Sequence, residues 1–281
     1  MSLAHVNLRT ALTWMEEGRR IAIATLVETE GSSPLDPGAM MLIDDNDNIE
    51  GSVTGGCVES ALVEEAREVL AGGQPRVKTY GISDPAAADV GLTCGGTVHI
   101  FVEALDEGPR QVLYESLGAA LGGRPVAVAM RLDDPDAGAR LAIIGGDVRG
   151  SLGLDFLDRT VERETKGMLA QGVDGLRHYG ADGAAMGSDV RVAVKTYTEP
   201  PRMIIFGAID FSAATAALAR QLGYRVAIVD PREPFIRSQR FEDVADVAVD
   251  IQRKEVVVRG DILDEAALRA AIIEAVYEAA A

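Results

Sequence analysis

The chain has 281 residues, 47% hydrophobic and 25% charged, a composition typical of globular proteins with a substantial core. Its 44 acidic residues exceed its 27 basic residues by 17, and this negative charge argues against nucleic-acid binding. No stretch approaches the roughly 20 consecutive apolar residues of a transmembrane helix, so we expect no association with a membrane.

The first residues show no basic segment followed by an apolar one, so we expect no secretory signal and a cytoplasmic location. Thiols stay reduced in that compartment, which makes a structural disulfide between Cys57 and Cys94 unexpected. The length suggests two domains.

The first hundred residues predict two helices and five strands, because their apolar residues recur at helical or at strand spacing. In chain order we expect a helix over 7–19, strands over 21–27, 39–44 and 49–53, a helix over 57–71, and strands over 76–81 and 97–105.

The same pattern then returns. Residues 49–81 align without a gap with residues 148–180, and glycines and tyrosines match outside the helix as well as within it. We therefore predict two copies of one α+β unit, residues 1–105 and 110–198, although a chance alignment of two similar helices is the alternative. The matching pairs include Gly51 with Gly150, Ser52 with Ser151, Gly73 with Gly172, Tyr80 with Tyr179 and Gly81 with Gly180.

The second copy lacks three features of the first: the loop over 28–38, the segment Gly55-Gly56-Cys57, and the loop that carries Cys94. A scaffold is needed in both copies, whereas a ligand site is needed only once. The three features therefore predict a single shared site in the first copy.

Cys57 lies in the first turn of a predicted helix, where free backbone N–H groups and the helix dipole favour anions. The preceding Gly55 and Gly56 would let a ligand approach the backbone. Thr54 adds a hydroxyl group, and Glu59 could either cap free N–H groups or accept a hydrogen bond from the ligand.

A second candidate segment, Cys94-Gly95-Gly96, offers another thiol on a loop of similar freedom. Ser32 and Ser33 are further candidates, although they fit a plain turn equally well. Two thiols beside glycines would suit a phosphate-bearing ligand with a soft metal or sulfur centre. The competing interpretation is that each cysteine is a small buried apolar residue. A zinc site is not indicated, because the ligand spacing is absent.

Residues 202–230 read as strand, tight turn, helix and strand, the opening of a dinucleotide-binding βαβ unit. Of the glycine fingerprint only Gly207 is present, since Ile209 and Ser212 occupy the other positions. Asp230 stands where a ribose hydroxyl would be bound, but such a residue is also common at strand ends. The pattern predicts the fold and supports NAD(P) only weakly.

We therefore predict an α/β chain. Its N-terminal α+β region, residues 1–198, consists of two related units, and a shortened Rossmann-like βαβ domain follows over 199–281. The edge of that short sheet would have to be covered by the last helix or by a second copy of the chain, so we expect a homodimer.

The chain resembles the XdhC/CoxI family in five motifs, GSSP, GSVTGGCVE, LTCGGTVHIFVE, FGA and LGYRVAIVDPREPF. Members of this family are accessory proteins of molybdenum hydroxylases of the xanthine dehydrogenase type and of the aerobic carbon monoxide dehydrogenase type. The resemblance implies a chaperone that binds molybdopterin, the molybdenum cofactor, protects it, supports its sulfuration and delivers it to the apo-enzyme. It also implies contact with a cysteine desulfurase. Cys57 would contact the molybdenum or its sulfur ligand, with Cys94 as a neighbouring thiol and with Gly55, Gly56, Gly95 and Gly96 admitting the cofactor.

The chain departs from the family pattern in its nucleotide fold, where Gly207-Ala208-Ile209-Asp210 replaces the usual G-A-G-H, and in its early end. A non-catalytic maturation factor is favoured. The alternatives are an NAD(P)-dependent oxidoreductase and a component of a xanthine dehydrogenase complex.

Overall fold

The computed structural model describes residues 3–81, 95–105, 107–198, 202–230, 232–241, 247–250 and 255–258. The chain divides into two compact units, one over residues 5–199 and the other formed mainly by residues 200–281. Each unit is described by itself.

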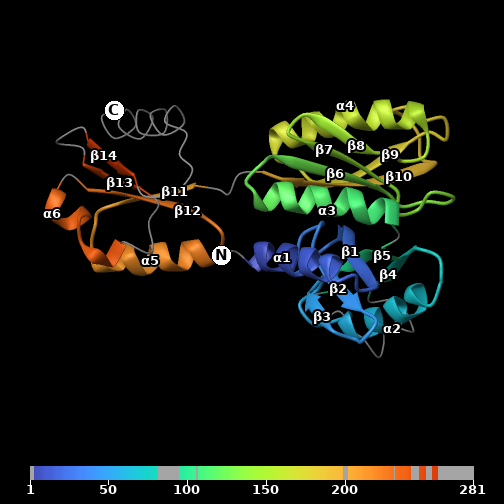
Figure 1. Ribbon diagram of the computed structural model, residues 1–281, viewed down its shortest axis with the longest axis horizontal. Helices are drawn as coiled ribbons and strands as arrows, with labels where there is room; N and C mark the ends of the chain where they lie inside the picture. The colour runs from blue at the N-terminus through green and yellow to red at the C-terminus, as the bar shows by residue number, and fades with distance from the viewer. Residues whose placement is uncertain are drawn as a thin grey trace. The chain divides into compact units, whose positions relative to one another are not determined.

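The first half of the 5–199 unit is a five-stranded antiparallel sheet with two helices (Figure 1). The sheet order is β3-β2-β1-β5-β4. Its elements are α1 (Leu3–Glu16), β1 (Ile21–Glu30), β2 (Met40–Asp44), β3 (Ile49–Gly51), α2 (Glu59–Leu70), β4 (Arg76–Tyr80) and β5 (Thr97–Ala104).

The second half repeats this arrangement, and its sheet order, β8-β7-β6-β10-β9, is the same connectivity. The pairing is equivalent too, since Ala24 lies opposite Met41 and Ala129 lies opposite Leu141. The elements are α3 (Glu107–Leu121), β6 (Val126–Arg131), β7 (Arg140–Ile144), β8 (Asp147–Gly150), α4 (Asp155–Gln171), β9 (Gly175–Tyr179) and β10 (Val190–Tyr197).

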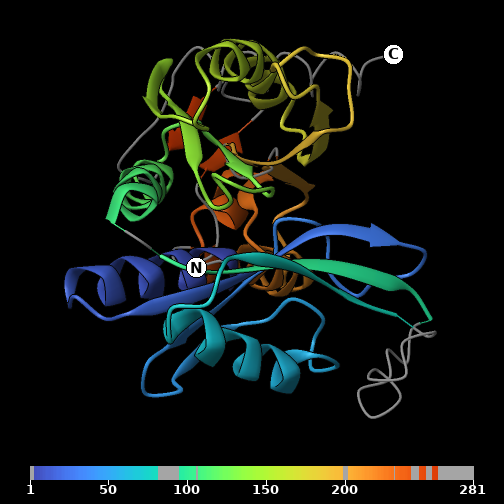
Figure 2. The ribbon, with the colours of Figure 1, turned by 90° about the vertical axis from the view of Figure 1, so that its right-hand side faces the viewer.

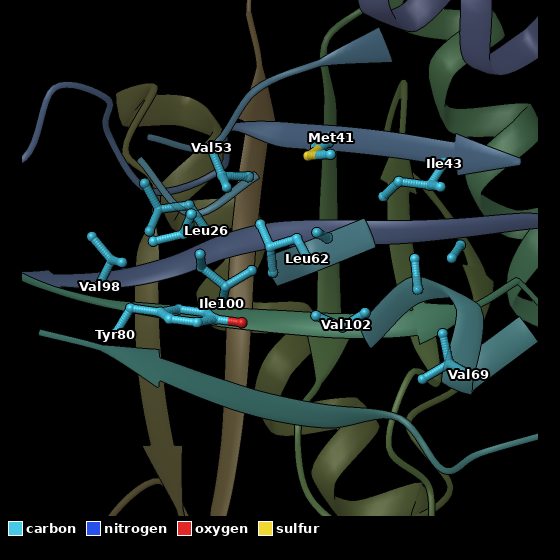
Figure 3. Packing of buried hydrophobic residues seen from close by; sticks show 14 of the residues in the cluster. Leu26, Met41, Ile43, Val53, Leu62, Val69, Tyr80, Val98, Ile100 and Val102 are labelled. Carbon is cyan, nitrogen blue, oxygen red and sulfur yellow. The ribbon is translucent and has the colours of Figure 1, made fainter. Parts of the chain in front are cut away.

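The helices and sheets form layers, as Figure 2 shows from a second direction. In the first copy α2 packs on one face of the sheet, over a buried cluster that includes Leu26, Ile100 and Leu62 (Figure 3). In the second copy α4 covers the corresponding face of its sheet. The other faces of the two sheets pack against α1, α3 and each other, with Phe101 and Met130 among the residues at the contact between sheets.

The C-terminal unit contains a four-stranded sheet of order β11-β12-β13-β14, in which the first three strands are parallel and β14 is antiparallel to β13. Its elements are β11 (Arg202–Phe206), α5 (Asp210–Gln221), β12 (Arg225–Val229), α6 (Glu233–Ile236), a short 3₁₀ helix (Gln239–Phe241), β13 (Val247–Asp250) and β14 (Glu255–Val258). The predicted fold class, two related α+β units followed by a small Rossmann-like piece, is confirmed.

Several element boundaries differ from those predicted. The first helix spans Leu3–Glu16 rather than 7–19, and β3 ends at Gly51 rather than at residue 53. β1 continues past residue 27 to Glu30, through an irregularity in its pairing with β5 between Leu26 and Glu28. α2 begins at Glu59 rather than at Cys57, so Cys57 belongs to the preceding loop. Across the helices that the structure describes, none has both the length and the apolar character needed to cross a bilayer.

Candidate functional site

The three segments that distinguish the first copy leave its sheet at one edge, the one formed by the carboxyl ends of β1, β3 and β4. β1 and β3 run in the same direction and end at this edge, β4 ends there as well, and β5 begins there. Figure 3 shows the corresponding core residues Leu26, Val53, Tyr80 and Val98 together at one end of the cluster. The topology therefore brings the loops over 31–39 and 52–58 to a common edge with Gly81 and with Gly95-Gly96, the described ends of the segment between β4 and β5.

Two of these loops touch. A Cβ atom added at Gly96 would lie 2.1 Å from the carbonyl oxygen of Ser32, so no side chain fits at position 96. Gly96 is buried, and its glycine is required by this close approach between loops. Leu35 of the 31–39 loop and Cys57 of the 52–58 loop also pack against the same buried cluster.

The loop over 52–58 is organised around the carboxylate of Glu59, the first residue of α2. The hydroxyl groups of Ser52 and Thr54 donate to it over 2.5 and 2.8 Å. Four backbone N–H groups also donate to it, those of Val53 at 3.2 Å, Thr54 at 2.9 Å, Gly56 at 3.0 Å and Val58 at 3.1 Å.

The N–H groups of Gly55 and Cys57 are also used. Gly55 donates to the hydroxyl oxygen of Ser52 at 2.7 Å, and Cys57 donates to that of Thr54 at 3.2 Å. The helix N-terminus is therefore already occupied by an anion of the protein itself. The expectation of free backbone N–H groups for a ligand anion at Cys57 is wrong for this loop, because each N–H from Val53 to Val58 has an internal acceptor.

Glu59 therefore takes the capping role, one of the two roles considered for it from the sequence. Burial of its carboxylate opposes ionisation, but the hydrogen bonds from Ser52 and Thr54 outweigh burial and lower the pKa of Glu59 to about 2. The carboxylate is ionised at neutral pH and holds the loop in one conformation.

Gly55 and Gly56 lie at the tip of this loop with φ angles of +76° and +116°, which side-chain-bearing residues rarely adopt. Both glycines are exposed, and no atom lies within 4 Å of an added Cβ at either position. Cys57 follows with a free, partly buried thiol. The loop thus presents an open backbone surface beside a thiol.

The second copy contains the same loop support without the glycines and the cysteine. Ser151 donates to Asp158 over 2.6 Å, the Leu152 N–H donates to the same carboxylate over 2.7 Å, and the Gly153 N–H donates to Ser151. The serine–acid pair is therefore part of the scaffold in both copies. Sequence reasoning missed Ser52, although a serine seven residues before an acidic residue occurs in both repeats.

The other predicted residues have less distinct surroundings. Ser33 donates to the carbonyl oxygen of Leu35 over 2.9 Å, as expected of a turn, and Ser32 is exposed. Gly95 is exposed with a φ angle of +79°. Cys94 lies outside the described residues, so its predicted proximity to Cys57 stays a prediction.

In the C-terminal unit, Asp230 is fully buried and already has partners. Its carboxylate accepts hydrogen bonds from the Ala208 N–H at 2.7 Å and from the backbone and guanidinium of Arg232 at 2.8 to 2.9 Å. The hydrogen bonds from Arg232 and Ala208 hold the pKa of Asp230 well below its usual range despite burial. Gly207, with φ +98°, donates to Val229. A ribose hydroxyl would have to compete with Arg232.

Comparison with known proteins gives two family matches. A model described as the XdhC and CoxI family matches residues 14–81, and one described as the XdhC Rossmann domain matches residues 203–280. The molybdenum cofactor insertion chaperone PaoD of Escherichia coli is 35% identical over 98 residues, which are 35% of this chain and 30% of PaoD. The uncharacterized protein YqeB of the same organism is 31% identical over 128 residues, 45% of this chain and 23% of YqeB.

Longer alignments are more distant. A probable xanthine dehydrogenase subunit of Bacillus subtilis is 24% identical over 248 residues, 84% of this chain and 67% of that protein. A crystal structure described as a xanthine dehydrogenase from Bacillus halodurans shares the fold, with a TM-score of 0.60 and 21% identity over 92% of this chain and 72% of that one. The chain matches less than a third of the length of PaoD and of YqeB.

Proposed function

Because this chain belongs to the XdhC and CoxI family, we propose that it is a chaperone that binds the molybdenum cofactor and delivers it to a molybdenum hydroxylase. The hydroxylase would be of the xanthine dehydrogenase or the carbon monoxide dehydrogenase type. In this proposal the protein protects the cofactor and supports its sulfuration, with a cysteine desulfurase as a further partner, and acts in the cytoplasm as a homodimer.

The observation that supports the proposal is the loop over 52–58. Its free Cys57 thiol follows two exposed glycines, and Glu59 fixes the loop at the edge where the features unique to the first copy leave the sheet. Such a loop binds a ligand at low entropic cost, because the conformation of the loop is set before the ligand arrives.

The residues present fit the cofactor in chemical terms. A thiolate prefers a soft partner, and the cofactor supplies a molybdenum centre with sulfur ligands. Cys57 would contact the metal or its sulfur ligand, and Gly55 and Gly56 would let the pterin lie against the backbone. Thr54 is buried and donates to Glu59, so its part is to hold the loop rather than to contact the ligand.

The alternative of an NAD(P)-dependent oxidoreductase receives less support. Asp230 is engaged by Arg232, and Ile209 replaces the glycine that would admit a pyrophosphate. Titration with NAD(P)H would separate the two proposals, since saturable binding at micromolar concentrations would favour the enzyme.

The test of the chaperone is retention of the cofactor. Protein would be mixed anaerobically with released molybdenum cofactor, passed through a desalting column and assayed for molybdenum per chain. We expect wild type to retain molybdenum and Cys57→Ala to lose it. The matched control is Phe156→Ala, since Phe156 is the 52% exposed equivalent of Cys57 in the second copy. Equal retention by wild type and Cys57→Ala would contradict the role of the thiol.

A further inference from the structure

In the C-terminal unit, α5 has small apolar residues on its inner face and large ones on its outer face. The helix lies along one face of the sheet (Figure 1), and Ala216 and Ala219 belong to the buried cluster between them. On the outer face Phe211 is 81% exposed and Leu218 is 63% exposed, and Leu222, directly after the helix, is 70% exposed. A helix at the surface of a globular protein ordinarily has a polar outer face, so the outer face of α5 is a candidate interaction surface.

Four exposed residues form a line along this outer face, which we call the α5 seam: Phe211, Thr215, Leu218 and Leu222. Their successive separations are four, three and four positions, which is the a/d spacing of helices that pack side by side. The Thr215 hydroxyl donates to the Phe211 carbonyl oxygen over 2.8 Å, so it has an acceptor within the helix. The α5 seam therefore requires apolar contact from a partner and no hydrogen bond.

The charges near the α5 seam permit contact with a second copy of the chain. The chain has 17 excess negative charges, so two copies repel each other at long range. From Phe211 to Leu222, however, no residue is acidic, and Arg220 is the one charged residue in this stretch of sequence. Asp210, at the start of the helix, is paired with Arg240. Two copies can therefore meet at the α5 seam without bringing unpaired carboxylates together.

The order of the seam residues also fits a two-fold axis. Because the separations of four, three and four read the same in both directions, two antiparallel α5 helices place each seam residue opposite a seam residue of the other copy. Phe211 would face Leu222 of the second copy at the ends, and the smaller Thr215 would face Leu218 at the centre. Such a contact is self-complementary and closes as a dimer. Antiparallel pairing also sets the positive end of one helix dipole beside the negative end of the other.

The exposed area of the α5 seam indicates how strong such a contact would be. Large apolar side chains each have about 150–250 Å² of surface, so Phe211, Leu218 and Leu222 at their observed exposures present roughly 400 Å². The flanking Ile209 and Ala214 are exposed as well and add to this area. The total approaches the roughly 600 Å² per partner of the smallest stable interfaces. We therefore expect a dimer that dissociates in the micromolar range and not a permanent one.

From these observations we infer that the α5 seam is the surface through which two copies of the chain associate, as an antiparallel pair of α5 helices about a two-fold axis. The inference deepens the homodimer of the proposed function, which names no surface, and it rests on that part of the proposed function alone. It does not depend on cofactor binding by the loop over 52–58.

The first test measures the mass of the full chain by sedimentation equilibrium at protein concentrations through the micromolar range. We expect wild type to show a reversible monomer–dimer equilibrium. Leu218→Glu brings a carboxylate from each copy into the centre of the contact and should raise the dissociation constant at least about a hundredfold. The matched control is Phe156→Glu, which introduces the same charge at a 52% exposed apolar residue of α4 in the other unit. It should leave the dissociation constant unchanged.

A second experiment tests the antiparallel orientation. An equal mixture of Phe211→Cys and Leu222→Cys chains should form a disulfide-linked dimer on mild oxidation, because these positions face each other. Phe211→Cys alone should not, since about 16 Å of helix would separate the two cysteines and a disulfide needs Cα atoms within about 7 Å. Wild type oxidised in parallel shows any linkage that involves Cys57 or Cys94. A linked dimer of Phe211→Cys alone, beyond that of wild type, would contradict the antiparallel pair.

The outcomes separate this inference from the proposed function. If wild type dimerises and a folded Leu218→Glu dimerises equally well, the homodimer stands and the role of the α5 seam is rejected. If thermal unfolding shows that Leu218→Glu is not folded, the cross-linking of the cysteine variants decides, and absence of a linked dimer in the mixture overturns the inference. If wild type is monomeric throughout, the homodimer is rejected too, whereas the chaperone is judged by the molybdenum retention of wild type and Cys57→Ala.

Discussion

The Glu103 carboxylate on β5 of the first copy pairs with the Arg140 guanidinium on β7 of the second, with Arg140 Nη1 3.0 Å from Glu103 Oε2. Both side chains are almost completely buried. Gly138 lies directly against this pair, since an added Cβ atom would be 2.8 Å from Glu103. The equivalent glycine of the first copy, Gly38, lies against Lys195 in the same way. The second copy therefore supports the 31–39 loop of the first.

Removing the charge of Glu103 should destabilise the protein strongly. In Glu103→Gln the Arg140 guanidinium stays buried without its counter-ion, which costs about 3–5 kcal/mol in comparable cases. Denaturant unfolding measures this loss. Glu162→Gln breaks the exposed pair with Lys166 and should cost less than about 1 kcal/mol. Similar unfolding midpoints for the two variants would mean that the buried pair does not join the copies.

The stability that Glu59 contributes should depend on pH. Its pKa is about 2 in the folded protein against an ordinary value of 4.5, so the unfolded chain takes up the proton first as the pH falls. The contribution is complete above about pH 4.5 and is lost between pH 4.5 and 2. We expect the difference in unfolding free energy between wild type and Glu59→Gln to be constant from about pH 8 to 5 and to shrink below that range.

A control separates Glu59 from the other carboxylates. Asp158→Asn changes the matching loop of the second copy, for which fewer hydrogen bonds to the carboxylate are found. A smaller loss of stability is therefore expected from Asp158→Asn at neutral pH. If the difference in unfolding free energy between wild type and Glu59→Gln does not vary with pH, the loop is held by packing and not by the ionised carboxylate.

The sequence predicted the helices and strands of both copies, because the apolar residues follow strand and helix periods closely and the repeat checks each assignment against the other. It predicted the start of α2 two residues early. The apolar pattern continues through Val58, whereas the helix begins only where the Glu59 carboxylate caps it. A capping interaction within seven residues leaves little mark on hydrophobic periodicity.

For the site, the comparison of repeats singled out three segments, since missing segments are visible in an alignment. That these segments form one ligand site stays a prediction. The comparison did not identify Arg131, whose buried guanidinium joins two loops of the second copy. That role depends on which side chains turn inward, and an alignment of the repeats does not show this. Capping of the N–H groups by Glu59 was one of the two roles considered from the sequence, and the sequence alone could not decide between them.

Replacing Gly96 of the first copy by alanine should lower the stability of the protein, whereas replacing Gly108 of the second copy should not. Gly96→Ala would place a Cβ atom 2.1 Å from the Ser32 carbonyl oxygen, so the two loops must move apart, at a cost of more than about 2 kcal/mol. Gly108→Ala, in α3, meets no atom within 4 Å and replaces a weak helix former, so it should be neutral or stabilising. Thermal unfolding of the two variants measures the contrast. Since Gly96 carries one candidate loop and Ser32 another, Gly96→Ala should also lower molybdenum retention, while Gly108→Ala should not. A Gly96→Ala protein with wild-type stability would mean that the two loops are not in contact in solution.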